Sequence, residues 1–168
     1  ANWGLACNSV HFIELMQYLT DRKKLYLSES LLDREIIQSK RSGYLELTGS
    51  LIFQCEDGAK LILKSSNTPT DGLINVEINN DENSVSATMT SGLLKCAYYR
   101  KGIWERDIEY EIPLQSQMTG NIVESIVRGS DCKLPSYHQS FQQHMLVFDT
   151  FESVFRRNAY APDVCPIT

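Results

Sequence analysis

The sequence predicts an α+β fold with an N-terminal helix, a six-stranded antiparallel meander and a C-terminal helix. Six short segments between residues 43 and 113 alternate apolar with polar side chains, and turn-forming residues separate them, as is typical of hairpin-linked strands. A segment on either side of them, residues 9–24 and a stretch after Pro135, repeats apolar residues at helical spacing. Because 168 residues are enough to bury one core, we expect a single domain, 1–168.

The first helix is expected over residues 9–24. Asn8 or Ser9 is suited to cap a helix that begins at Val10, because the side-chain oxygen accepts a hydrogen bond from the first turn. The basic residues 22–24 follow near the C-terminal end, where the helix dipole favours cations, and we interpret them as a solvated helix end. The expected apolar stripe consists of Phe12, Leu15, Met16 and Leu19.

Residues 25–42 are compatible with two structures. Leu25 and Leu27 alternate with polar or amphipathic neighbours, as in a strand. Ser30 followed by the sequence Asp-Arg-Glu-Ile-Ile at 33–37 is equally suited to begin a helical turn. This region is therefore expected to be mixed.

The central sheet is expected over residues 43–113. Gly58 and Gly102 lie in two of its turns, where glycine supplies the positive φ that a tight hairpin requires. Gly49 interrupts the first strand, as at a bulge or a bend, and Pro113 ends the last strand because it has no N–H to donate. The predicted strands are 44–55, 59–64, 73–78, 84–90, 93–99 and 103–112.

Short connections predict that these strands pair in sequence order. Six twisted strands either curl into a half-barrel or barrel, or lay one face on the two helices. The curled form has the shape of lipocalin-like and lipoprotein-carrier-like domains, but an analogy of shape transfers no function.

The C-terminal region, 114–168, is expected to contain a connector, a helix and a tail. Residues 118–128 fit either a seventh strand or a short helix. Ser136 is a suitable N-cap for the helix, although residues 145–148 would also fit a strand. The tail is expected to be extended and loose unless Cys165 is tied down. The helix is predicted from the spacing of Tyr137, Phe141, Met145, Phe148, Phe151 and Phe155.

Charge and hydropathy exclude some classes of function. A net charge of −5 argues against a nucleic-acid partner, whose phosphates require a basic surface. No apolar run reaches the roughly 18–20 residues of a membrane-spanning helix. The chain starts at Ala1 without a visible signal peptide, so a leader or membrane anchor preceding Ala1 is compatible with the sequence.

Five cysteines suggest an oxidising compartment. No two of them form a Cys-x-x-Cys pair, which removes the main support for a zinc ribbon or a thioredoxin-like site. Spacing does not fix a pairing, but we expect Cys132 to bridge to Cys165 and Cys55 to Cys96, which places the protein in the periplasm or outside the cell. Five reduced thiols in a cytosolic protein are the alternative.

The sequence contains no motif that defines an enzyme. His138 and His144 are six residues apart and do not share a helix stripe as a zinc pair does, so no metal or cofactor is expected. A thiol nucleophile, Cys132 or Cys96 with one of these histidines, would need the base within hydrogen-bond reach. The alternating acidic residues of 103–112 are interpreted as the solvent side of a strand: Glu105, Asp107, Glu109 and Glu111.

The sequence therefore favours a non-enzymatic extracytoplasmic domain that binds a small hydrophobic ligand or a partner protein on its curved sheet. The first alternative is an intracellular adaptor or accessory subunit that acts through a protein interface. The second is a cysteine-dependent enzyme. The side chains expected to line the binding surface are Phe53, Ile74, Val76, Met89, Tyr98, Trp104, Ile108 and Tyr110.

Overall fold

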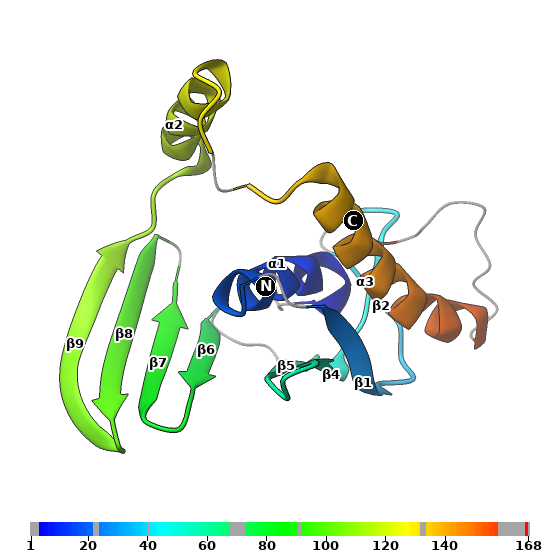
Figure 1. Ribbon diagram of the computed structural model, residues 1–168. Coiled ribbons are helices and arrows are strands. Elements are labelled where there is room, and N and C mark those ends of the chain that lie inside the picture. Colours follow the sequence, from blue (N-terminus) through cyan, green and yellow to red (C-terminus); the bar gives the residue numbers. More distant parts are fainter. Residues whose placement is uncertain are drawn as a thin grey trace. The chain divides into compact units, whose positions relative to one another are not determined.

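The computed structural model has an α+β architecture with an N-terminal helix, antiparallel sheets and a C-terminal helix (Figure 1). It divides into two compact units: unit 1 is Ala1–Pro69 with Pro135–Thr168, and unit 2 is Thr70–Leu134. Each unit is considered by itself. The residues described are 4–21, 24–39, 41–67, 73–90, 92–131, 134–157 and 167.

Unit 1 is a layer of helices on a three-stranded antiparallel sheet of order β1-β4-β5, with a two-stranded β2-β3 ladder beside it. Both α1 and α3 contact strands of the sheets, and they also contact each other. Packing helices against one face of a sheet is a common way to bury that face when it is apolar. The elements are α1 (Leu5–Leu19), β1 (Leu25–Leu32), β2 (Ile37–Gln38), β3 (Leu45–Glu46), β4 (Gly49–Cys55), β5 (Lys60–Ser65) and α3 (Tyr137–Arg157).

The core of unit 1 lies between this sheet and the helices. Phe53 is fully buried at the centre of β4, where Leu27 of β1 and Leu61 of β5 are its cross-strand partners. Burying a side chain of this size stabilises the fold by about 1.5–3 kcal/mol. From the helices, the core receives Leu5, Ala6, Ile13, Val147, Phe151, Val154 and Phe155.

The N-terminal helix starts earlier than predicted and buries a different stripe. It begins at Leu5, so Asn8 and Ser9 lie inside the first turns, where each side chain donates a hydrogen bond to the carbonyl four residues before it, at Gly4 and Leu5. It ends at Leu19 rather than Lys24. Of the predicted stripe, Phe12 and Met16 are half-buried and pack against the core, whereas Leu15 and Leu19 are exposed. The residues that the helix buries fully are Leu5, Ala6, Ser9 and Ile13.

A carboxylate from a distant strand caps α1. Glu46 Oε1 accepts hydrogen bonds from the N–H groups of Ala6 and Leu47, at 2.6 and 2.9 Å, and Oε2 accepts one from Cys7 at 3.3 Å. Leu5 N–H donates to the Leu47 carbonyl at 3.1 Å. Glu46 therefore satisfies free N–H groups of the first helical turn and holds the helix start on β3.

The segment 25–42 is β1 followed by the short β2, so the strand interpretation of Leu25 and Leu27 is confirmed. Gly49 has φ +117°, and a Cβ there would lie 2.4 Å from the Leu31 carbonyl oxygen. The interruption in the first predicted strand is therefore a close approach to β1. Gly49 is the first residue of β4, and Leu47 and Thr48 separate it from β3.

The C-terminal helix confirms Ser136 as its cap. Ser136 Oγ accepts a hydrogen bond from Gln139 N–H, and Gln139 Oε1 accepts one from Ser136 N–H, which together form a capping box. The aromatic pattern is only partly the buried face. Phe151 and Phe155 are buried, whereas Tyr137, Phe141 and Met145 are exposed.

Unit 2 is a four-stranded antiparallel meander followed by a helix. Its strands pair in sequence order, β6-β7-β8-β9, so β6 and β9 are the two edges (Figure 1). The ladders described connect β5 to β4 and β6 to β7 but not β5 to β6, and no closed barrel is formed among the described strands. The elements are β6 (Ile74–Asn79), β7 (Asn83–Met89), β8 (Leu93–Arg100), β9 (Ile103–Glu111) and α2 (Gln115–Val127).

Residues 118–128, open between strand and helix in the sequence, form most of α2. Its N-terminal end is held by Gln117, whose Oε1 accepts a hydrogen bond from Leu114 N–H at 2.7 Å. None of its residues is buried, and Val123, Ile126 and Val127 are each more than half exposed.

We expect Gly4→Ala to destabilise unit 1 by about 1–3 kcal/mol, because overpacking forces neighbours apart. A Cβ at Gly4 would lie 1.8 Å from Glu46 Cδ, and the carboxylate has to leave its three N–H donors to make room. Urea denaturation of the single and double variants measures this. In a Glu46→Ala background the cost of Gly4→Ala should largely disappear, and an equal cost in both backgrounds would contradict the explanation.

Unit 1 should also depend on pH through Glu46. Burial raises the pKa of Glu46 above its ordinary value of 4.5, against the lowering effect of its N–H donors. The folded state then holds the proton more tightly, so this group contributes most to the free energy of unfolding below pH 4.5 and less as the pH rises through the folded-state pKa. The difference in unfolding free energy between wild type and Glu46→Gln should decline with rising pH, and a constant or rising difference argues against this assignment.

Candidate interaction surface

The register of unit 2 separates an apolar face from a polar one. Side chains that are cross-strand partners lie on the same side of a sheet, and the side alternates along each strand. Three consecutive rows across the four strands are almost entirely apolar, and together they are called the apolar face. They are Ile74–Met89–Leu94–Tyr110, Val76–Ala87–Cys96–Ile108 and Ile78–Val85–Tyr98–Arg106.

This face is incompletely buried. Ala87 at its centre is buried, but Ile78 on one edge strand and Tyr110 on the other are 41% and 56% exposed. The remaining apolar members are half-buried. The helix α2, which is the helix among the described residues of unit 2, buries none of its own side chains, so it does not cover the face. A sheet face of this composition is usually packed against another layer.

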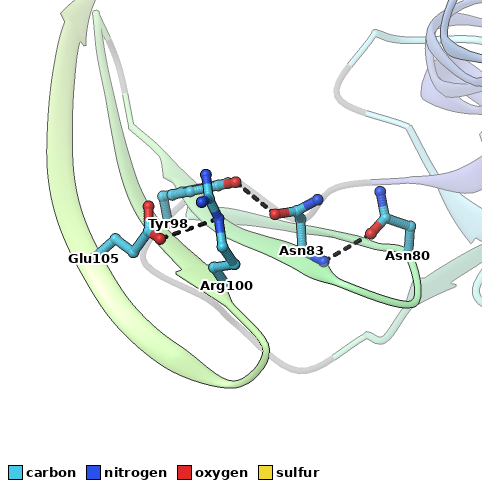
Figure 2. A network of polar contacts seen from close by, with 5 residues as sticks. All are labelled: Asn80, Asn83, Tyr98, Arg100 and Glu105. Carbon is cyan, nitrogen blue, oxygen red and sulfur yellow. Dashed lines mark hydrogen bonds and ion pairs between the residues drawn. The ribbon is translucent and has the colours of Figure 1, made fainter.

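A polar network lines the hairpin end of the apolar face (Figure 2). Tyr98 Oη donates a 2.6 Å hydrogen bond to Asn83 Oδ1, and Asn83 N–H donates to Asn80 Oδ1 at 2.7 Å, which ties β8 to the β6–β7 turn. Arg100 Nε lies 3.1 Å from Glu105 Oε1. The side chains of Tyr98 and Glu105 raise the pKa of Arg100 above its ordinary value.

Arg106 is the one charged member of the apolar face. Its guanidinium carbon lies 5.7 Å from the centre of the Tyr98 ring, within the range of a cation–π interaction. The charge is thus placed at the hairpin end, beside the polar network. The centre of the face, around Ala87 and Cys96, carries no charge.

The opposite face of the sheet is polar. Lys95 Nζ is 3.0 Å from Glu109 Oε1, its cross-strand partner, and Thr88 Oγ1 donates to Asn75 Oδ1 at 3.0 Å. Asp107 and Glu109 are exposed, in keeping with the predicted solvent side of the last strand. The two faces therefore differ sharply in chemistry.

Six of the eight side chains expected to form the binding surface lie together on the apolar face, and two lie elsewhere. Phe53 is in the core of unit 1. Trp104 pairs with Tyr99 on the polar face, because a register shift between Tyr98 and Tyr99 changes the side to which β9 side chains point. The six on the apolar face are Ile74, Val76, Met89, Tyr98, Ile108 and Tyr110.

The remaining members of the apolar face were outside the predicted binding set. Ile78, Val85, Ala87 and Leu94 were not named as binding residues, although the alternation of the strands already places Ile78 with Ile74 and Val76, and Val85 and Ala87 with Met89. Arg106 keeps the two-residue alternation with Ile108 and Tyr110, so its side also follows from the sequence, but a charged residue gave no reason to include it in an apolar set. Cys96 was assigned to a disulfide instead.

Cys55 and Cys96 are free thiols. Cys55 is buried in unit 1 and its Sγ lies 3.8 Å from Thr20 Oγ1, whereas Cys96 is half-buried in unit 2. The expected Cys55–Cys96 bridge is not formed. Cys132 and Cys165 lie outside the described residues.

The histidines lie on helices of unit 1. His11 on α1 and His138 and His144 on α3 are exposed, and His144 Nδ1 contacts the Ser140 carbonyl of its own helix at 2.7 Å. Cys96 has Ala87 and Ile108 as cross-strand partners, and neither side chain is a base. Within the described residues, no three His, Cys, Asp or Glu side chains are grouped as metal ligands.

Comparison of the chain with models of protein families, with curated proteins and with solved structures found no match. Among the described residues, none of the helices has the length and apolar character needed to span a membrane.

Alkylation of the unfolded chain without reductant should label Cys55 and Cys96, because both are free thiols. Peptide mass spectrometry identifies the labelled positions. If either position is labelled only after reduction, it forms a disulfide and the thiol assignment is wrong.

Proposed function

We propose that the protein is a binding domain that docks a partner protein on the apolar face of β6–β9. The observation that carries this proposal is the composition of that face: eleven of its twelve members are apolar or aromatic, and the one charge lies at an end. Exposed contiguous apolar surface rimmed by polar groups marks interaction sites in soluble proteins.

The face has the anatomy of a protein interface. Tyr98, Tyr110 and Arg106 belong to the residue types that most often contribute large binding energies. The network of Asn83, Tyr98, Arg100 and Glu105 supplies a polar rim at one end. Tyr98 belongs to both the apolar face and the polar rim, because its ring lies on the face and its hydroxyl donates a hydrogen bond to Asn83 in the rim.

A small hydrophobic ligand, the other class expected from a curled half-barrel, is less well supported. Pockets for such ligands enclose most of the ligand surface. The described sheet of unit 2 has two unpaired edges, β6 and β9, and α2 does not cover it. An open sheet is better matched by the broad surface of another protein.

Docking of a partner protein on this face is compatible both with an extracytoplasmic domain and with an intracellular adaptor. The number of free thiols distinguishes these two locations, because disulfides persist in oxidising compartments. The enzyme alternative has no comparable support. A thiol nucleophile requires a base or a cation beside it, and the cross-strand partners of Cys96 are apolar.

A photoreactive phenylalanine analogue placed at Ile78 should crosslink to one discrete protein species, whereas the same residue at Asn79 should not. Ile78 is 41% exposed on the apolar face, and Asn79 is its neighbour on the polar face of the same strand. Both positions are exposed, so both variants are expected to fold, which circular dichroism checks.

Adducts are identified by mass spectrometry, and a Tyr110→Lys variant on the opposite edge strand should reduce the yield from position 78 at least tenfold. Equal adducts from positions 78 and 79, or no adduct from position 78, would overturn the proposed function.

A further inference from the structure

We infer that the open edge of β9 binds an extended peptide segment of a partner protein, which carries basic side chains at alternate positions and pairs with β9 as an added antiparallel strand. β9 ends the strand order β6-β7-β8-β9, and β8 is its partner among the described strands (Figure 1). Such an edge presents unpaired N–H and C=O groups to another chain. The inference goes beyond the docking proposed above, because it concerns a surface other than the apolar face and does not depend on it.

The backbone groups at this edge belong to three acidic residues. Ile112 N–H donates to the Gly92 carbonyl at 2.9 Å, which fixes the alternation of the β8–β9 ladder. In an antiparallel ladder, pairs that exchange backbone hydrogen bonds alternate with pairs that do not. The residues of β9 that bond to β8 are therefore Arg106, Ile108 and Tyr110. Those whose N–H and C=O groups point to the open edge are Asp107, Glu109 and Glu111.

The carboxylates of these three residues form one row on the polar face, and all three residues are exposed. Each residue of an added strand that bonds to one of them also places its side chain directly opposite a carboxylate. Lys95 Nζ, 3.0 Å from Glu109 Oε1, supplies one cation to the row from the β8 side. Because opposite charges stabilise such cross-strand pairs, the row favours a strand in which every second residue is lysine or arginine.

The residues between the basic positions are expected to be apolar. They lie on the other side of the added strand, beside the half-buried Ile108 and the 56% exposed Tyr110. The bulge before Arg106 and the missing N–H of Pro113 bound the usable edge. The edge therefore fits a segment of about seven residues that alternates basic with apolar side chains.

Trp104 is a second feature that favours a cationic partner. It lies at the hairpin end of the acidic row, on the same face, and is 56% exposed. Its indole N–H donates to Asp107 Oδ1 at 3.0 Å, which holds the ring beside that carboxylate. An ammonium or guanidinium group within about 6 Å of a tryptophan ring is attracted to its face. A basic side chain opposite Asp107 therefore has both a carboxylate and an aromatic ring within reach.

Charge separates this partner from two alternatives. A second β9 strand paired antiparallel would bring carboxylates opposite carboxylates, which is destabilising. The other open edge, β6, follows the same alternation, because Asn80 N–H donates to the Asn83 carbonyl at 2.9 Å. The β6 residues with outward backbone groups are Asn75, Glu77 and Asn79. With one charge among these three, the β6 edge selects a basic strand far less than β9 does.

Fluorescence anisotropy of the full chain with a labelled peptide, Val-Lys-Val-Lys-Val-Lys-Val, tests the inference. The peptide should bind at least tenfold more tightly than Val-Glu-Val-Glu-Val-Glu-Val. Methylation of the three lysine backbone nitrogens removes the N–H groups that pair with β9 and should abolish binding. Methylation of three valine nitrogens, which face away from β9, should change the dissociation constant less than twofold. Equal binding of the two methylated peptides, or no binding of the lysine peptide, would overturn the inference.

A pair of charge reversals locates the site. Glu111→Lys should raise the dissociation constant of the lysine peptide at least fivefold, because it places a like charge opposite one lysine. Glu77→Lys is the matched control, since it reverses the charge of another exposed glutamate on the same face. β6 lies about 14 Å from β9, beyond the screening length of about 8 Å, so the control should change binding less than twofold. A larger effect of Glu77→Lys than of Glu111→Lys contradicts binding at β9, and circular dichroism checks that both variants fold.

Amide hydrogen exchange, followed by NMR, gives a readout on the wild-type chain. Exchange at Asp107, Glu109 and Glu111 should be fast without peptide, and saturating lysine peptide should slow it at least tenfold. The amides of Ile108 and Tyr110 bond to β8 and should be slow in both states. Unchanged exchange at the three acidic positions rules out an added strand at this edge. That result leaves the docking on the apolar face standing, because crosslinking from position 78 tests it separately.

Discussion

The two-residue period of the β-strand is the constraint on which the surface of unit 2 depends. Because every strand alternates sides, the pairing register decides which residues are collected on each face, and a slip of one residue moves a whole set to the other side. The register of β6–β9 aligns Val76, Ala87, Cys96 and Ile108 in one row. The bulge in β9 lies between Trp104 and Arg106, at the hairpin end, so the alternation of Arg106, Ile108 and Tyr110 is unbroken and the centre of the face stays apolar.

Unit 1 depends on a different constraint, the free N–H groups at the start of α1. They are satisfied by Glu46, which is forty residues away from Ala6 in sequence. The sequence rules for helix caps consider only residues next to the helix start, and they therefore predicted Asn8 or Ser9 as the cap. The true start of the helix is determined by tertiary structure, and Gly4 fits because its missing side chain leaves room for the carboxylate.

The difference between a local sequence pattern and a long-range contact also explains which parts of the sheets and of the surface could be predicted from the sequence. Alternation identified the strands of unit 2 because each is regular over six or more residues. In β1 a register shift between Leu27 and Glu29 interrupts the pattern, so this strand remained one of two alternatives. Trp104 was grouped with Tyr98 for a similar reason, since a bulge leaves no local mark in a single sequence. The aromatic content of α3 predicted its helix but not its buried face, which depends on contact with α1 and β1.

The area of the apolar face limits how tightly the proposed docking could hold a partner. The three rows measure roughly 19 by 17 Å, so the face and an equal partner surface bury about 650 Å², which gives about 16 kcal/mol as an upper value at about 25 cal/mol per Å². Most members of the face are already half-buried by their neighbours, which reduces this to roughly 8 kcal/mol. Association opposes it with about 4–15 kcal/mol of lost translational and rotational freedom. Because the two quantities are of the same size, the proposed docking is expected to be reversible rather than permanent, and its strength is expected to depend on the contribution of Arg106 and the two tyrosines.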